Sequence, residues 1–60
     1  MKRRAFIRKL EADGCERTRS SGKHDIYHNP TTNQSAPVPR HTEIADTLCK
    51  SIRKELGLPR

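Results

Sequence analysis

The stretch Gly22-Lys23-His24-Asp25-Ile26-Tyr27 decides the fold, because it starts at a turn and continues as the best candidate for a central β-strand. Residues 20–22 read Ser-Ser-Gly, which favours a turn, and Ile26 and Tyr27 favour an extended backbone. The same stretch carries a histidine, a side chain that can take or give a proton at neutral pH. His24 is therefore the first candidate for a catalytic residue.

Two further strands are predicted, one before this stretch and one after it. Residues 15–20 alternate weakly in the manner of a strand, and residues 23–28 form the better, middle strand. Residues 29–33 read Asn-Pro-Thr-Thr-Asn and predict a turn, which a third strand follows over residues 34–39. Pro37 lies inside that third strand and has no N–H to donate, so the strand is expected at an edge of the sheet.

Helical spacing of apolar residues marks both ends of the chain. Residues 2–13 place Phe6, Ile7 and Leu10 on one face, and Gly14 follows where a helix is expected to end. Residues 42–56 predict a second helix, with Thr42 as its N-cap. Its apolar face consists of Ile44, Ala45, Leu48, Cys49, Ile52 and Leu56.

The predicted order is helix, three strands, helix, within a single domain over residues 1–60. The expected fold is α+β, with a three-stranded antiparallel sheet that carries both helices on one face and leaves the other face open. His24, Ile26 and His28 share one face of the middle strand, while Tyr27 lies on the other. Because histidines are more easily solvated than buried, the face that carries His24 is expected to be the open one.

Distances along the strand limit which residues can act together with His24. His28 is four residues away, or roughly 13 Å, so the two histidines cannot act on the same phosphate. Tyr27 is expected to pack in the core, or to stack on a base or a protein partner. If residues 21–22 form a two-residue turn, Arg19 faces His24 and brings a cation to roughly 5 Å.

A histidine beside cations suits RNA cleavage. That reaction needs a base to remove the proton of a 2′-hydroxyl group and positive charge to stabilise the phosphate as its charge develops. Besides Arg19, the candidates for RNA or phosphate contact are Lys23, Arg17, Arg3 and Arg4. For the basic residues of the first helix, solubility alone is the open alternative.

The charge balance points to an anionic partner. Thirteen lysines and arginines against seven aspartates and glutamates give a net charge of +6. Such a chain attracts nucleic acid first, with an acidic protein or an anionic membrane surface as competitors. No apolar run is long enough to cross a membrane or to form a signal peptide, so a cytoplasmic location is expected.

The cysteines and histidines predict neither a disulfide framework nor a metal site. Cys15 and Cys49 are far apart in the sequence and are expected to behave as small buried apolar residues. His24, His28 and His41 contain no closely spaced pair of ligands. No metal and no other cofactor is expected.

Several short motifs occur in an order and spacing that resemble the HicA toxin family: Gly14, Arg19, Gly22-Lys23-His24 with Tyr27, Asn29-Pro30, Pro39 with His41, and residues 52–58. The likeness covers nearly the whole chain. It implies a fold like that of double-stranded-RNA-binding domains, cleavage of messenger RNA without a required metal, and neutralisation by a HicB antitoxin. It also implies that His24, in the glycine-lysine-histidine motif, is the catalytic residue.

The alternative is a non-catalytic RNA-binding module of the same fold. Such modules bind the phosphates of a duplex largely through lysines at the start of the second helix. Here that region reads Thr42-Glu43-Ile44-Ala45-Asp46, which is acidic. The sequence therefore favours the nuclease over the duplex-binding module.

Overall fold

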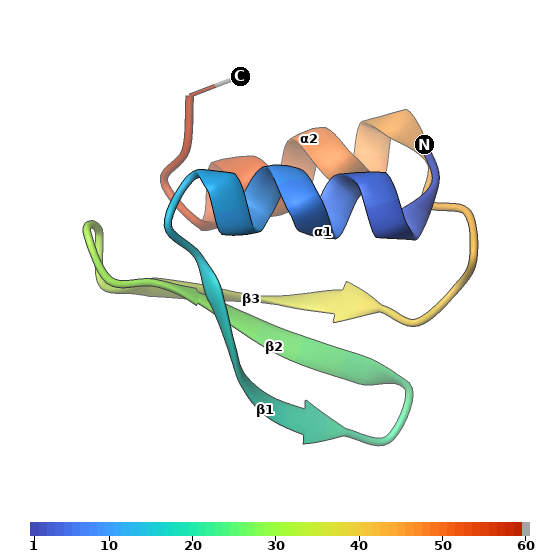
Figure 1. The fold of residues 1–60 in the computed structure, drawn as a ribbon, viewed down its shortest axis with the longest axis horizontal. Coiled ribbons are helices and arrows are strands. Elements are labelled where there is room, and N and C mark those ends of the chain that lie inside the picture. The colour runs from blue at the N-terminus through green and yellow to red at the C-terminus, as the bar shows by residue number, and fades with distance from the viewer. Residues whose placement is uncertain (60) are drawn as a thin grey trace.

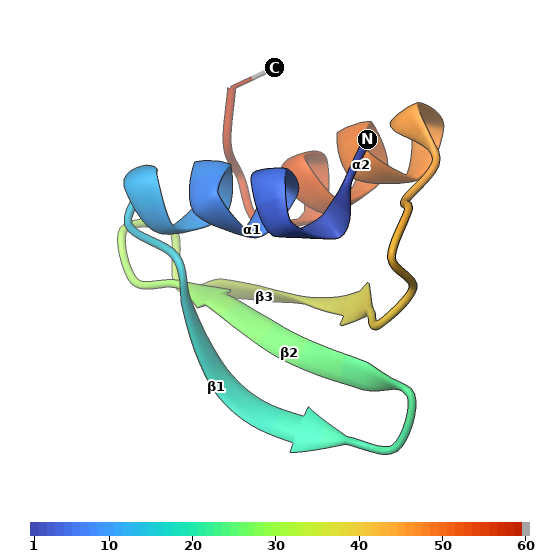
Figure 2. The same cartoon turned by 45° about the vertical axis from the view of Figure 1, so that its right-hand side comes forward.

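The computed structural model describes residues 1–59, apart from the side chain of residue 21. The elements follow the order α1 (Arg3–Ala12), β1 (Glu16–Ser21), β2 (His24–Asn29), β3 (Gln34–Pro39) and α2 (Asp46–Glu55) (Figure 1). The strands form an antiparallel sheet in the order β1-β2-β3, and both helices lie over the same face of it (Figure 2). The predicted α-β-β-β-α fold is confirmed.

The core lies between the helices and the sheet. Its largest fully buried apolar side chains come from both helices, from β3 and from the segments that flank α2: Phe6, Leu10, Val38, Ile44, Ile52 and Leu56. Cys15 and Cys49 are also buried, as predicted, and burial raises the pKa of both thiols. Both cysteines therefore act as small apolar residues of this core.

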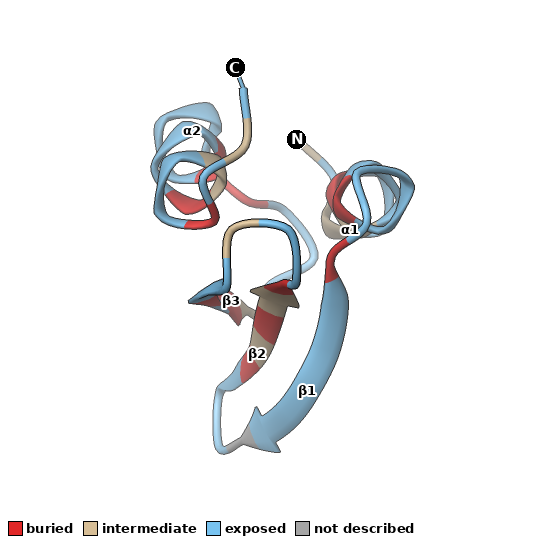
Figure 3. Cartoon of the chain, turned by 90° about the vertical axis from the view of Figure 1, so that its left-hand side faces the viewer, coloured by how far each residue is buried: buried red, intermediate tan, exposed pale blue. Residues whose placement is uncertain are grey.

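The middle strand has one buried face and one open face. Asp25, Tyr27 and Asn29 are buried, while His24 is exposed and the residues between them are half-buried. Figure 3 shows this alternation as bands of buried and intermediate colour along β2. This alternation follows from the period of two along a strand. The prediction that His24 lies on the open face is confirmed.

The turn between β1 and β2 differs from the predicted one by one residue. The loop consists of Gly22 and Lys23 rather than residues 21–22, and Gly22 occupies its first position with φ +52°. A two-residue hairpin that begins with glycine requires positive φ at that position. Both strands consequently begin and end one residue later than predicted.

The second helix begins four residues later than predicted, and Thr42 is not its N-cap. The backbone N–H of Arg3 donates to the Thr42 carbonyl at 2.8 Å, and that of Ile44 donates to the Met1 carbonyl at 2.8 Å. Lys2 and Glu43 form an isolated antiparallel bridge between these contacts. Pairing with the N-terminal residues keeps residues 42–45 out of the helix, a tertiary effect that helical spacing does not reveal.

The outer strand β3 is an edge strand, as the proline inside it predicted. The hydrogen bonding between β2 and β3 extends one residue beyond the strands, because the backbone N–H of Arg40 donates to the Lys23 carbonyl at 3.2 Å. Because hydrogen-bonding positions alternate along an antiparallel strand, residues 36 and 38 bond to β2 while residues 35, 37 and 39 point away from it. Pro37 and Pro39 therefore occupy positions where the missing N–H costs no bond within the sheet.

The turn between β2 and β3 holds the end of α2. The Asn29 side-chain amide and the Thr32 hydroxyl each donate to the Leu56 carbonyl at 2.8 Å. The next residue, Gly57, has φ +72°, and a Cβ atom there would lie 2.7 Å from the Thr32 methyl carbon. Thr32 cannot move away without disturbing its hydrogen bond to the helix.

Substituting Gly57 is therefore expected to destabilise the fold more than substituting a glycine that has positive φ but open space around it. Gly14 is the matched control, because it has φ +91° but no neighbouring atom within 4 Å of the position that a Cβ would take. Strain costs either alanine variant about 1–2 kcal/mol, and crowding adds roughly 1–3 kcal/mol to Gly57→Ala. Urea unfolding of both variants measures the difference, and equal losses would contradict the tight contact with Thr32.

Candidate active site

His24 is the first residue of β2 and stands at the corner of the sheet next to the hairpin turn. Its imidazole is exposed on the open face, where a substrate can reach it without any movement of the core. Lys23 precedes it in the turn and is also exposed. His24 and the cation Lys23 are therefore consecutive exposed residues at the hairpin end of the sheet.

The orientation of His24 is fixed by its neighbour Asp25, which forms an ion-pair cluster under the helices. The Asp25 carboxylate accepts from Arg3 Nη2 at 2.7 Å and from Arg40 Nε and Nη2 at 3.1 and 2.9 Å. Arg3 also donates from Nε to the Pro39 carbonyl at 2.9 Å. Since successive strand residues point to opposite faces, an inward Asp25 requires an outward His24.

The electrostatics of this cluster favour the ionised carboxylate. Burial by itself raises the pKa of Asp25, but hydrogen bonds from Arg40 and Ser20 and the charges of Arg40 and Arg3 outweigh it. The net effect lowers the pKa of Asp25 below its usual value. Asp25 therefore stays charged at neutral pH and holds both arginines in place.

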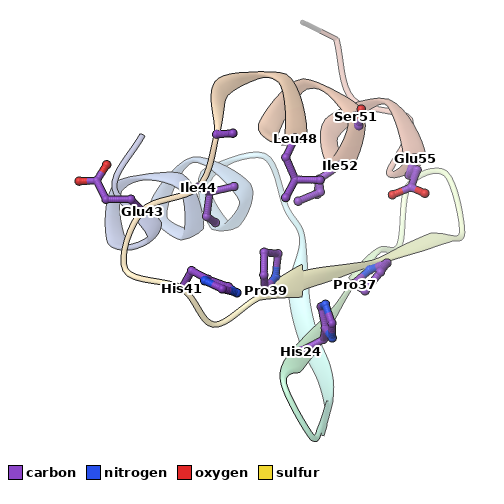
Figure 4. A pocket seen from close by; sticks show the side chains of 11 residues that line it. His24, Pro37, Pro39, His41, Glu43, Ile44, Leu48, Ser51, Ile52 and Glu55 are labelled. Atoms are coloured by element: carbon purple, nitrogen blue, oxygen red, sulfur yellow. The ribbon is translucent and has the colours of Figure 1, made fainter.

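A groove of about 590 Å³ runs between α2 and the edge strand β3, and His24 lies on its sheet side (Figure 4). Its lining is apolar in the middle and carries histidine or carboxylate groups around it: His24, Pro37, Pro39, His41, Glu43, Ile44, Ala45, Leu48, Ser51, Ile52 and Glu55. Leu48 was predicted on the apolar face of its helix, yet 42% of it is exposed. Its side chain faces the groove instead of the closed core.

The predicted pairing of Arg19 with His24 is wrong. His24 pairs with Ser21, and Arg19 pairs with Ile26, because the turn lies one residue later than predicted. Arg19 still shares the open face with His24, as its diagonal neighbour at roughly 7–8 Å. It can reach a phosphate held near His24, but it does not contact the imidazole from directly across the turn.

The other predicted phosphate-binding residues lie in different environments. Arg3 is engaged by Asp25, so its guanidinium holds the fold together. Arg4 is exposed on α1 and borders a separate basic hollow, which also contains Lys2 and Arg8. Arg17 lies beyond the irregularity in β1, and Lys23 is the predicted cation nearest to His24 in the chain.

Tyr27 and His28 do not join the site. Tyr27 is only 5% exposed, and burial raises the pKa of its hydroxyl group. Of its two predicted roles, core packing agrees with this position, whereas stacking on a base or partner would need an exposed ring. His28 is half-buried, and its Nδ1 atom lies 2.8 Å from the Ser35 hydroxyl.

Sequence reasoning missed Arg40 and His41 as neighbours of His24. Both follow β3, and the antiparallel pairing of His24 with Pro39 brings that end of β3 to the start of β2. The predicted topology already contained this information. In an antiparallel pair, the residues that follow β3 lie beside the start of β2 and the turn before it. Across residues 1–59, no group of three or more histidine, cysteine or acidic side chains is arranged to hold a metal ion.

Fold and site together define a small basic α+β protein that presents a histidine and cations on an open sheet face. The family model described as "HicA toxin of bacterial toxin-antitoxin" matches residues 3–58. The chain belongs to the HicA toxin family, and it is the toxin of a toxin–antitoxin system with an antitoxin partner. No curated protein and no solved structure matches the sequence.

Neither helix within residues 1–59 has the length and apolar character needed to span a membrane.

The ion-pair cluster predicts a loss of stability in acid. Because the pKa of Asp25 is lowered in the folded state, its contribution is complete above its unfolded value, about 4, and disappears as the pH falls through the folded value. Asp25→Asn should lower the melting temperature by several degrees at pH 7, and its deficit relative to the wild type should shrink toward pH 2.

Asp46→Asn is the control, because the Asp46 side chain is 84% exposed and should matter less. Thermal unfolding followed by circular dichroism between pH 2 and pH 7 measures both variants. A deficit of Asp25→Asn that stays constant over this range would contradict the lowered pKa.

Proposed function

We propose that this toxin is an endoribonuclease that cleaves messenger RNA, with His24 as the general base. The observation that carries the proposal is the position of His24, exposed on the open sheet face next to Lys23 and diagonal to Arg19. Membership of the HicA family supports the same activity. The outward histidine gives the reaction a proton acceptor, and the cations give it a place for phosphate.

In the proposed reaction, neutral His24 takes the proton from a 2′-hydroxyl group of the RNA. The 2′-oxygen attacks the adjacent phosphorus atom, and the bond from phosphorus to the 5′-oxygen breaks. The products are a 2′,3′-cyclic phosphate and a free 5′-hydroxyl group. Lys23 and Arg19 stabilise the additional negative charge on the phosphate, so the protein's own side chains provide both proton removal and charge stabilisation without a metal.

The non-catalytic RNA-binding module is less consistent with this surface. Duplex-binding domains use lysines at the start of the second helix. In this chain α2 begins with Asp46, and Glu43 lies just before it, beside the groove. Acidic groups at that position repel a phosphate backbone laid along the start of α2, which leaves the sheet side, where His24 lies, as the better surface for RNA.

Substituting His24 should abolish cleavage while leaving the fold intact. His24→Ala is expected to lower the rate about 10²–10⁴-fold, the usual contribution of a general base. His28→Ala is the matched control, because His28 lies on the same strand and the same face. The measurements are cleavage of a labelled RNA, growth arrest on expression, and circular dichroism of the purified variants.

Wild-type cleavage by folded His24→Ala would refute the proposed mechanism. A comparable loss in His28→Ala would show that the sheet face, rather than His24 itself, controls the activity.

We further propose that the antitoxin partner is an acidic protein of the HicB type. The net charge of +6 favours an acidic partner, and family membership supplies the antitoxin. Co-expression with the product of an acidic neighbouring reading frame should relieve growth arrest and yield a stable complex on purification. Continued arrest while the two proteins remain bound would count against neutralisation by occlusion of His24.

A further inference from the structure

A second histidine borders the same groove as His24. His41 lies two residues after β3, is exposed, and lines the groove together with His24 and Pro39. Figure 4 shows both imidazole rings on the sheet side of the groove, with Pro39 between them in this view. The base proposed above therefore has a second proton-transfer group beside it.

The strand pairing limits the separation of the two histidines. Arg40 donates its backbone N–H to the Lys23 carbonyl, which makes His24 and Pro39 the adjacent pair without hydrogen bonds, at roughly 4.5 Å between Cα atoms. Two further residues add at most about 7 Å to reach His41. The Cα atoms thus lie within roughly 11–12 Å, a span across which two imidazoles can approach opposite sides of one phosphate.

We infer that His41 is the general acid of the proposed RNA cleavage, the group that protonates the departing 5′-oxygen. This inference rests on the proposed function and extends it from the base to the leaving group. Breaking the bond to the 5′-oxygen leaves an alkoxide, which is a poor leaving group unless it receives a proton as the bond breaks. His24 cannot supply that proton while it is acting as the base.

The proton balance of the step is complete. The 2′-hydroxyl proton passes to His24, which becomes an imidazolium, and the proton of the His41 imidazolium passes to the 5′-oxygen. A bond forms between the 2′-oxygen and phosphorus, and the bond between phosphorus and the 5′-oxygen breaks. Exchange with water then returns one proton to His41 and removes one from His24, so the enzyme is restored without a co-reactant.

The other ionisable groups on the groove suit this step less well. Glu43 and Glu55 line it, but an ionised carboxylate only accepts hydrogen bonds and has no proton to give. Glu43 also lies 3.9 Å from the N-terminal amine. Arg40 and Lys23 flank the histidines in the chain as cations, which suit charge stabilisation better than proton transfer. Imidazole is the side chain most often used to give or take a proton near neutral pH, so His41 suits the step best.

The test compares two leaving groups in one RNA. The wild-type cleavage site is mapped in an oligoribonucleotide, which is then made with either oxygen or sulfur at the bridging 5′ position. A thiolate leaves without needing a proton. His41→Ala should therefore slow cleavage of the oxygen-linked RNA about 10²–10⁴-fold but cleave the sulfur-linked RNA at close to the wild-type rate.

Two control variants separate this inference from the proposed function. His24→Ala should lose activity on both RNAs, because removal of the 2′-hydroxyl proton precedes either leaving group. His28→Ala should cleave both RNAs normally. Circular dichroism establishes that each variant is folded, and His41→Gln repeats the test with a side chain of more similar size.

Two outcomes would overturn the role of His41 and leave the proposed nuclease intact: wild-type cleavage of the oxygen-linked RNA by His41→Ala, or equal losses on both RNAs, which would make His41 a positioning residue. Retention of activity by His24→Ala would instead remove the proposed function itself.

Discussion

The buried carboxylate of Asp25 is the constraint on which the presentation of the site depends. Two arginines from segments far apart in the sequence, Arg3 at the start of α1 and Arg40 after β3, converge on it. A charged group under the helices is tolerated only when its hydrogen bonds are satisfied, so Asp25 cannot exchange faces with its neighbour. The same contacts join the first helix, the middle strand and the segment that carries His41.

The sequence predicted the fold because local patterns and global topology agree. Apolar spacing identified both helices, and Pro37 identified the edge strand, where the structure places it away from the hydrogen bonds to β2. The hairpin register was wrong by one residue, because Ser-Ser-Gly-Lys accommodates a two-residue loop in more than one position. The loop of residues 22–23, which begins with Gly22, is selected over residues 21–22 only by the pairing along the full length of both strands.

The candidate site was predicted in part, for a similar reason. His24 stands out by residue type and by its place after a turn, so a local pattern suffices to find it. Arg3 was predicted at a phosphate and instead binds Asp25, since sequence spacing does not show which basic residue of an exposed helix end will reach the core. Arg40 and His41 come close to His24 only through the pairing of β2 with β3, a contact between residues about fifteen positions apart.

The two prolines of β3 also determine how the chain can associate with others. An exposed edge strand normally offers a row of amide donors and carbonyl acceptors on which a foreign strand can add itself to the sheet. Here two of the three outward positions of that edge, Pro37 and Pro39, have no donor. Edge-to-edge aggregation is disfavoured for this basic toxin, and a protein that binds along this side must engage the side chains of the groove instead of extending the sheet.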